Sequence, residues 1–138
     1  MQNKNIFITG GAGFIANTII AKLIDKNKIT VYDNFLRDTL TDSPFAKHPN
    51  INIIKGDVLD ALHLKESMKG MDIVVHAAGI AGVDTVIKKP VKTMEVNMIG
   101  TANALAAAYA NGITDRFIDF STSEVFGSMA FRSSETDQ

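Results

Sequence analysis

The sequence contains no cysteine, and its charges almost balance: 14 lysine and arginine residues against 15 aspartate and glutamate residues give a formal net charge of −1. Without cysteine, disulfides and thiolate metal sites are excluded. The charge balance predicts no attraction to nucleic acid or to an anionic membrane. The three histidines, His48, His63 and His76, show no ligand spacing, so we predict no metal site.

Long apolar runs are also absent, and none would span a bilayer. Residues 1–4 lead directly into an apolar, strand-like stretch, so no signal peptide is predicted and we expect a cytoplasmic protein. Hydrophobic residues make up 46% of the chain and charged residues 21%, as in ordinary globular proteins. A chain of 138 residues is long enough for one domain with a sizeable core.

Short apolar stretches alternate with stretches of helical periodicity along the whole chain. We predict strands at 6–9, 28–32, 51–54, 72–76 and 116–120, and helices at about 13–25, 59–68 and 93–111. Residues 34–50 are interpreted as a loop that could hold a short helix, and a loop with Pro90 precedes the last helix. This order is typical of an α/β fold with a doubly wound parallel sheet, the Rossmann fold.

The first predicted strand ends in a glycine-rich turn, Gly10-Gly11-Ala12-Gly13, which opens a helix. Glycines let the backbone approach a pyrophosphate closely, and the helix N-terminus supplies free N–H groups and a positive dipole end. The preceding strand and the following helix strengthen a motif that would be weak alone. The alternative is a tight turn that simply needs glycine.

Asp33 lies at the end of the second predicted strand, about twenty residues past the glycines. A carboxylate there would accept hydrogen bonds from the hydroxyls of an adenosine ribose and would repel a 2′-phosphate. No arginine immediately follows Asp33, which favours NAD over NADP as the cofactor. In the alternative interpretation, Asp33 and Asn34 only form a turn.

Six motifs occur in order along the chain: Thr9-Gly10-Gly11-Ala12-Gly13-Phe14-Ile15, Asp33-Asn34, Gly56-Asp57-Val58, His76-Ala77-Ala78-Gly79, Val96-Asn97-Met98-Ile99-Gly100-Thr101 and Ser121-Thr122-Ser123-Glu124-Val125-Phe126-Gly127. Together they resemble the extended short-chain dehydrogenase/reductase family, in particular its NAD-dependent nucleotide-sugar epimerases, 4,6-dehydratases and decarboxylases. The resemblance covers essentially the whole chain. One departure is Ala16, which occupies a position where the family usually has glycine.

The resemblance implies a set of cofactor-binding residues: Gly10, Gly13, Phe14, Ile15, Asp33, Asn34, Asp57, Val58, Ala77, Ala78, Gly79, Asn97 and Ser121. It implies that Asp57 binds the adenine amino group, although Gly-Asp before a helix is also common in helix N-cap regions. It implies that Asn97 braces the floor of the active site, unless this side chain faces solvent. His76 is interpreted as a structural residue at a strand end.

Three catalytic candidates, Thr122, Ser123 and Glu124, follow the fifth predicted strand. The resemblance implies that the hydroxyl of Thr122 contacts the reacting oxygen of a nucleotide-sugar substrate, whose carbon gives a hydride to NAD. Glu124 would act as a general acid or base, or would bind sugar hydroxyls. The alternative is a solvated polar loop.

The Tyr-x-x-x-Lys pair that serves as the base in this family is missing, because neither Tyr32 nor Tyr109 has lysine four residues later. We therefore interpret residues 1–138 as an incomplete NAD-binding domain, truncated after the fifth strand and inactive alone. The resemblance implies a C-terminal substrate domain and a homodimer for the full-length protein. The alternative function is a non-catalytic NAD-binding sensor or scaffold module.

Overall fold

The computed structural model describes residues 1–122 and 125. Its centre is a five-stranded sheet with the order β3-β2-β1-β4-β5, in which every neighbouring pair is parallel. The strands are β1 Asn5–Thr9, β2 Lys28–Asp33, β3 Ile51–Lys55, β4 Ile73–His76 and β5 Arg116–Asp119. The predicted doubly wound parallel sheet is confirmed, and each strand lies within one or two residues of its predicted position.

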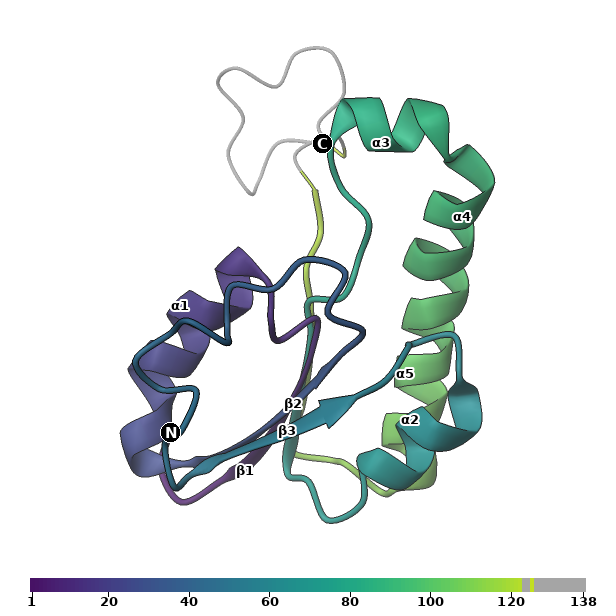
Figure 1. Ribbon diagram of the computed structural model, residues 1–138. Coiled ribbons are helices and arrows are strands. Elements are labelled where there is room, and N and C mark those ends of the chain that lie inside the picture. Colours follow the sequence, from purple (N-terminus) through teal and green to yellow (C-terminus); the bar gives the residue numbers. More distant parts are fainter. Residues whose placement is uncertain (123–124, 126–138) are drawn as a thin grey trace.

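Helices cover both faces of the sheet (Figure 1). The described helices are α1 Phe14–Leu23, the 3-10 helix η1 Ile24–Lys26, α2 Ala61–Ser67, α3 Val83–Lys88, α4 Pro90–Met94, the π-helix η2 Glu95–Ile99 and α5 Gly100–Ala110. α1 lies on one face, and α2 and α5 lie on the other (Figure 1). The chain moves outward from β1 to β2 and β3, then returns to β4 on the other side of β1, so right-handed crossovers place the two sets of helices on opposite faces.

The segment before the last helix differs from the sequence prediction. Residues 83–94, predicted as a loop with Pro90, contain α3 and α4, and the long helical region begins at Pro90 rather than near residue 93. Pro90 is the first residue of α4, where its fixed φ suits a helix and its missing N–H removes no helical hydrogen bond. Residues 34–50 contain turns and no helix, so this loop carries no short helix.

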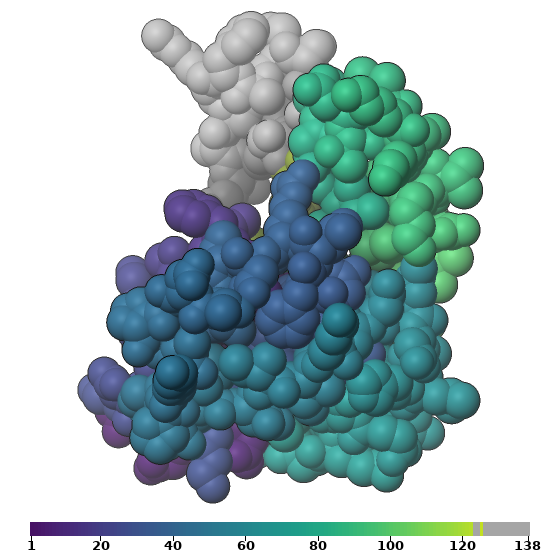
Figure 2. All heavy atoms as spheres, viewed as in Figure 1, coloured from purple at the N-terminus to yellow at the C-terminus, as the bar shows by residue number. Residues whose placement is uncertain are grey.

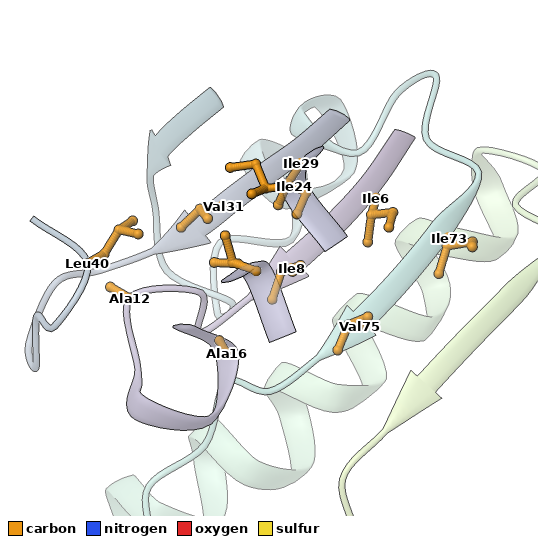
Figure 3. Close-up of a cluster of buried hydrophobic side chains, with 11 residues drawn as sticks. Ile6, Ile8, Ala12, Ala16, Ile24, Ile29, Val31, Leu40, Ile73 and Val75 are labelled. Carbon is orange, nitrogen blue, oxygen red and sulfur yellow. The ribbon is translucent and has the colours of Figure 1, made fainter. Parts of the chain in front are cut away.

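The core forms two layers, one on each face of the sheet. On the α1 face, Ile6 and Ile8 of β1 pack with a cluster that includes Ala16 of α1 (Figure 3). On the opposite face, Phe7 of β1 packs with Leu64 of α2. Neighbouring residues of one strand thus contribute to different layers, which explains why the middle of β1 is a continuous apolar run. The two layers hold the carboxyl ends of the parallel strands at one edge, where the predicted site residues lie.

Candidate cofactor site

Gly10 forms the turn between β1 and α1 in a backbone conformation that favours glycine, with φ of +65°. Its N–H donates to the carbonyl oxygen of Tyr32 (2.9 Å), and its carbonyl accepts from the N–H of Gly13 (3.0 Å). A Cβ atom at Gly10 would lie 2.6 Å from the backbone nitrogen of Ala78. The glycine turn therefore packs directly against the segment that follows β4. Ala77, the first residue of that segment, lies 67 residues after Gly10 in the sequence.

α1 presents an uncapped N-terminus beside this turn. Gly13 occupies the N-cap position without a side-chain cap, and no acceptor among residues 1–122 and 125 contacts the N–H groups of Phe14 and Ile15. The side chains of Phe14 and Ile15 are exposed, whereas Ala16 is buried against the sheet. Free N–H groups and the positive end of the helix dipole suit an anion such as a pyrophosphate. Ala16 fills the position where the family usually has glycine by packing into the core.

The carboxylate of Asp33 is buried and fixes two neighbouring turns. Its Oδ2 accepts from the N–H of Ala12 (3.0 Å), and its Oδ1 accepts from the N–H of Phe35 (2.7 Å). Each carboxylate oxygen has a second lone pair, so both can accept a further hydrogen bond. Asn34 forms a turn of its own, in which its Oδ1 accepts from the N–H of Leu36 (3.0 Å). Asp33 can therefore fix the two turns and still accept hydrogen bonds from a ribose.

Thr39 holds the glycine turn from the other side, which the sequence did not indicate. Its N–H and its hydroxyl both donate to the carbonyl oxygen of Ala12, at 2.9 and 2.8 Å. Figure 2 shows the segment between β2 and β3 in blue, with the green helices α3 and α4 above it and to one side. Because Asp33 binds the N–H of Ala12 and Thr39 binds its carbonyl, the glycine turn is fixed at both sides of one residue.

The turn after β3 is shaped by Tyr32. A Cβ atom at Gly56 would lie 2.2 Å from the ring of Tyr32, so only glycine fits there. The buried hydroxyl of Tyr32 donates to the carbonyl of Asp57 (3.1 Å), and burial raises the pKa of Tyr32 to about 12. Asp57 Oδ1 accepts from the N–H of Leu59 (3.0 Å), while the N-cap of α2 is Asp60. Asp57 therefore precedes the helix cap instead of forming it.

Val58, the next residue, is buried in the core of the α2 and α5 face. A Cβ atom at Gly100 of α5 would lie 2.6 Å from a methyl carbon of Val58, so this contact requires glycine in the helix. Asn103 adds a hydrogen bond from its side chain to the carbonyl of Val58 (2.9 Å). These contacts fix the Asp57 turn relative to α5.

Ala77, Ala78 and Gly79 follow β4 and lie beside the glycine turn and the π-helix η2. Asn97 of η2 makes two hydrogen bonds to the backbone of Ile80: its Oδ1 accepts from the N–H (2.7 Å), and its Nδ2 donates to the carbonyl (3.0 Å). A Cβ atom at Gly79 would lie 3.3 Å from this Oδ1. Asn97 thus holds the segment after β4, which leaves little space for a side chain at residue 79.

His76, the last residue of β4, is buried between two threonines. Its Nδ1 lies 2.7 Å from the hydroxyl of Thr9, and its Nε2 lies 3.1 Å from the hydroxyl of Thr101. Burial lowers the pKa of His76, while the nearby carboxylate of Asp119 acts in the opposite direction. These partners agree with the structural role inferred for His76 from the sequence.

Ser121 and Thr122 follow β5 at the same edge of the sheet, and both are exposed. The carbonyl of Thr122 accepts a hydrogen bond from the N–H of Val125 (3.3 Å). Ser123 and Glu124 lie outside the described residues.

Among the residues that the structure describes, no helix is long and apolar enough to cross a membrane.

The chain matches the model of the NAD dependent epimerase/dehydratase family over residues 6–138. The chain belongs to this family. Two curated decarboxylases are similar to it in sequence. It is 36% identical over 128 residues to UDP-glucuronic acid decarboxylase 1 of Danio rerio, covering 91% of this chain and 29% of the relative. It is 36% identical over 129 residues to UDP-N-acetyl-alpha-D-glucosaminuronate decarboxylase of Bacillus cytotoxicus, covering 91% of this chain and 39% of the relative.

Two solved structures of family type have the same fold. A UDP-N-acetylglucosamine 4-epimerase of Methanobrevibacter ruminantium, in complex with UDP-N-acetylmuramic acid, superposes with a TM-score of 0.87 at 30% identity, covering 99% of this chain and 44% of that one. A dTDP-glucose 4,6-dehydratase of Streptomyces venezuelae, solved with NAD, superposes with a TM-score of 0.83 at 28% identity, covering 97% and 44%. This chain therefore spans less than half of each relative, and NAD is the cofactor of its family.

The site geometry fits NAD on observations of this chain alone. The space over Gly13 and the α1 N-terminus would take the pyrophosphate, and the Asp33 carboxylate at the end of β2 would take the ribose. The predicted residues of the first four strands meet at one sheet edge, whereas Val58 is part of the core. Thr9, Thr39 and Thr101 are the residues that sequence reasoning missed. Thr9 and Thr101 lie within the quoted motifs but had no role assigned from the sequence, and Thr39 lies outside every motif.

Proposed function

We propose that the protein carrying this chain is an NAD-dependent epimerase or dehydratase of nucleotide sugars, and that residues 1–138 belong to its cofactor-binding domain. The observation that supports this most is the glycine turn, in which Gly10 packs on the backbone of Ala78 and leaves the α1 N-terminus open. The family membership and the epimerase, dehydratase and decarboxylase relatives support the reaction class.

The chain's own residues divide the binding of the cofactor among four turns. The N–H groups of Phe14 and Ile15 would hold the pyrophosphate, and Asp33 would accept from the ribose hydroxyls. The carboxylate of Asp57 would accept a hydrogen bond from the adenine amino group. Its bond to the N–H of Leu59 uses one lone pair of Oδ1, so other lone pairs stay available. Ala77, Ala78 and Gly79 would line the path to the nicotinamide end, because their small side chains leave room.

Thr122 would orient the substrate with a hydrogen bond to the sugar hydroxyl that reacts, and Ser121 would lie beside it. When bound, NAD supplies the acceptor for a hydride from a sugar carbon. Ser123 and Glu124 stay predictions as catalytic residues, with Glu124 as general acid or base. The hydride transfer also needs a base that removes the proton of the sugar hydroxyl. Residues 1–138 contain no Tyr-x-x-x-Lys pair to act as this base.

The cofactor assignment is tested by titrating NAD and NADP into the protein as its gene encodes it, with Asp33→Asn as the variant. Asparagine keeps one acceptor but presents an NH₂ group to a backbone N–H, so the affinity for NAD should fall by about tenfold. Asp38→Asn is the matched control, because Asp38 also accepts from backbone N–H groups in the same segment but is exposed. Preference for NADP in the unchanged protein would contradict the proposal.

The reaction is tested with a panel of UDP- and dTDP-linked sugars, by following product formation and transient NADH absorbance. Turnover of at least one nucleotide sugar, lost in Thr122→Val and retained in Thr122→Ser, is expected because a hydroxyl at this position would orient the substrate. NAD binding without turnover of any sugar in the panel would favour the non-catalytic sensor or scaffold module.

We also propose that the whole protein forms a homodimer and is cytoplasmic. The helical region from α4 to α5 exposes apolar side chains, among them Val91, Met94 and Met98, which line an open groove of about 500 Å³. An apolar patch of this kind is typical of an interface. Light scattering of the full gene product should give twice the monomer mass, and Met98→Lys should reduce it.

A further inference from the structure

His76 lies in a chain of hydrogen bonds that runs from β1 to η2. Thr9 and His76 are buried, with 0% and 2% of their surfaces exposed. The hydroxyl of Thr9 lies 2.7 Å from His76 Nδ1, and the hydroxyl of Thr101 lies 3.1 Å from His76 Nε2. The chain continues at both ends, because the N–H of Ala78 donates to Thr9 Oγ1 (3.3 Å) and Thr101 Oγ1 donates to the carbonyl of Asn97 (2.7 Å).

The partners determine where the protons lie. A carbonyl oxygen only accepts, so the single hydroxyl proton of Thr101 goes to Asn97. The Thr101 oxygen can then only accept from His76, which places a proton on Nε2. In a neutral imidazole Nδ1 is then an acceptor, and it receives the hydroxyl proton of Thr9. Every donor in the chain has an acceptor when His76 is neutral with Nε2 protonated.

The surroundings of His76 favour this neutral form. β1 contributes the uncharged Thr9 and α5 the uncharged Thr101, while β5 contributes the ring of Phe117, 6.3 Å away, and Asp119, the register partner of His76. Among the described residues, Asp119 is thus the charged group that faces His76. Burial lowers the pKa of His76 and is the larger cause, while Asp119 raises it.

These hydrogen bonds hold both ends of the segment 77–80. Ala78 is held through Thr9, and Ile80 is held by the two hydrogen bonds from Asn97. Asn97 lies in the π-helix η2, where the N–H of Gly100 reaches the carbonyl of Glu95 instead of that of Val96. π-helical turns are costly and are frequent at functional sites. The hydroxyl of Thr101 supports this turn by binding the carbonyl of Asn97.

We propose that His76 is a positioning residue of the cofactor site, which as a neutral imidazole links Thr9 to Thr101 and thereby fixes residues 77–80 against the glycine turn. His76 touches no cofactor in this role. It acts through Ala78 and Asn97 on the segment expected to line the nicotinamide end, so this inference rests on the proposed NAD binding. The histidine is needed because it offers one acceptor and one donor on opposite sides of a rigid ring.

The first test measures the proton position directly, without cofactor. In the full gene product labelled with ¹⁵N-histidine, the signal lost in His76→Gln belongs to His76. Its ring nitrogen shifts at pH 7 should show a proton on Nε2 and none on Nδ1. They should stay unchanged as the pH is lowered to about 6.5, the ordinary pKa of a histidine, because burial lowers the pKa of His76. A proton on Nδ1, or titration of His76 at the ordinary histidine pKa of about 6.5, would overturn the proposal.

The second test breaks the chain at its far end. Thr101→Val should weaken NAD binding by about five- to tenfold, and Thr101→Ser should restore it to within about twofold, because serine keeps the hydroxyl. Thr93→Val is the matched control. Thr93 makes the same kind of bond to a carbonyl four residues earlier in this helical region (2.9 Å to Lys89), without contact to His76. It should bind NAD normally.

The outcomes separate this inference from the proposed function. If Thr101→Val loses thermal stability but binds NAD as tightly as the unchanged protein, Thr101 and His76 are purely structural and the inference is wrong. If the unchanged protein itself fails to bind NAD, the proposed function is wrong. The ¹⁵N measurement then still decides whether the hydrogen-bonded chain exists.

Discussion

The replacement Gly13→Ala separates cofactor binding from folding. Gly13 has φ of −79° and ψ of 163°, an extended conformation that any residue adopts. The nearest atom to an added Cβ is the carbonyl oxygen of Gly10 at 3.2 Å, so a shift of a few tenths of an ångström is enough. Replacing glycine where the backbone is compatible restricts the unfolded chain, which stabilises the fold by about 0.4–1 kcal/mol. The free energy of unfolding should therefore change by less than about 1 kcal/mol.

The effect on binding should be much larger. The new methyl group would stand at the mouth of the α1 N-terminus, between the free N–H groups of Phe14 and Ile15 and any pyrophosphate. A hydrogen bond to a charged group contributes about 1.5–3 kcal/mol. Loss of one such bond lowers the affinity for NAD by about 10- to 150-fold. Isothermal titration calorimetry of the full gene product with NAD measures this difference.

Gly70→Ala is the matched control for this experiment. Gly70 has φ of +72° with open space around it, so alanine there is strained without meeting another atom. We expect Gly70→Ala to lose about 1 kcal/mol of stability and to bind NAD normally, the reverse of Gly13→Ala. The reasoning would be refuted if Gly13→Ala bound NAD within about twofold of the unchanged protein while remaining folded.

Three further predictions concern stability. Gly10→Ala should lower the free energy of unfolding in denaturant by at least about 3 kcal/mol, because a strained φ adds to a 2.6 Å contact with the nitrogen of Ala78; a loss below about 1 kcal/mol would contradict this packing. Tyr32→Phe should cost about 1–2 kcal/mol in the same assay, since the half-buried carbonyl of Asp57 loses its donor. The lowered pKa of His76 means that the unfolded chain takes up a proton first as pH falls below about 6.5. Stability should therefore be full above that pH and decline below it until the folded-state pKa is reached, and His76→Gln should lack this component.

Local patterns were enough for most of the fold. Buried parallel strands carry continuous apolar runs, so residues such as Ile6, Phe7 and Ile8 predict a strand whichever face each one packs on. The glycine turn was recognisable because a strand precedes it and a helix follows. The loop predicted around Pro90 was wrong, because the sequence alone does not distinguish a proline that starts a helix from a proline in a loop.

The positions of Asp33 and Gly10 could be read from spacing along the chain, but their contacts could not. Asp33 was expected to bind a ribose or to form a turn, and its two oxygens in fact accept from Ala12 and Phe35 at once. Which pair of N–H groups reaches a carboxylate depends on how two neighbouring strands end in space. Sequence spacing carries no information on that.

By itself the sequence determined the order of the strands and of the helices α1, α2 and α5, the glycine-rich turn and the family. Those features depend on residues close together in the chain and on their periodic burial. Only the tertiary structure decided that Gly10 packs on Ala78, that His76 joins Thr9 to Thr101, and that Asn97 holds Ile80. These contacts arise because the return from β3 to β4 brings the second half of the chain beside β1. No local pattern encodes that meeting.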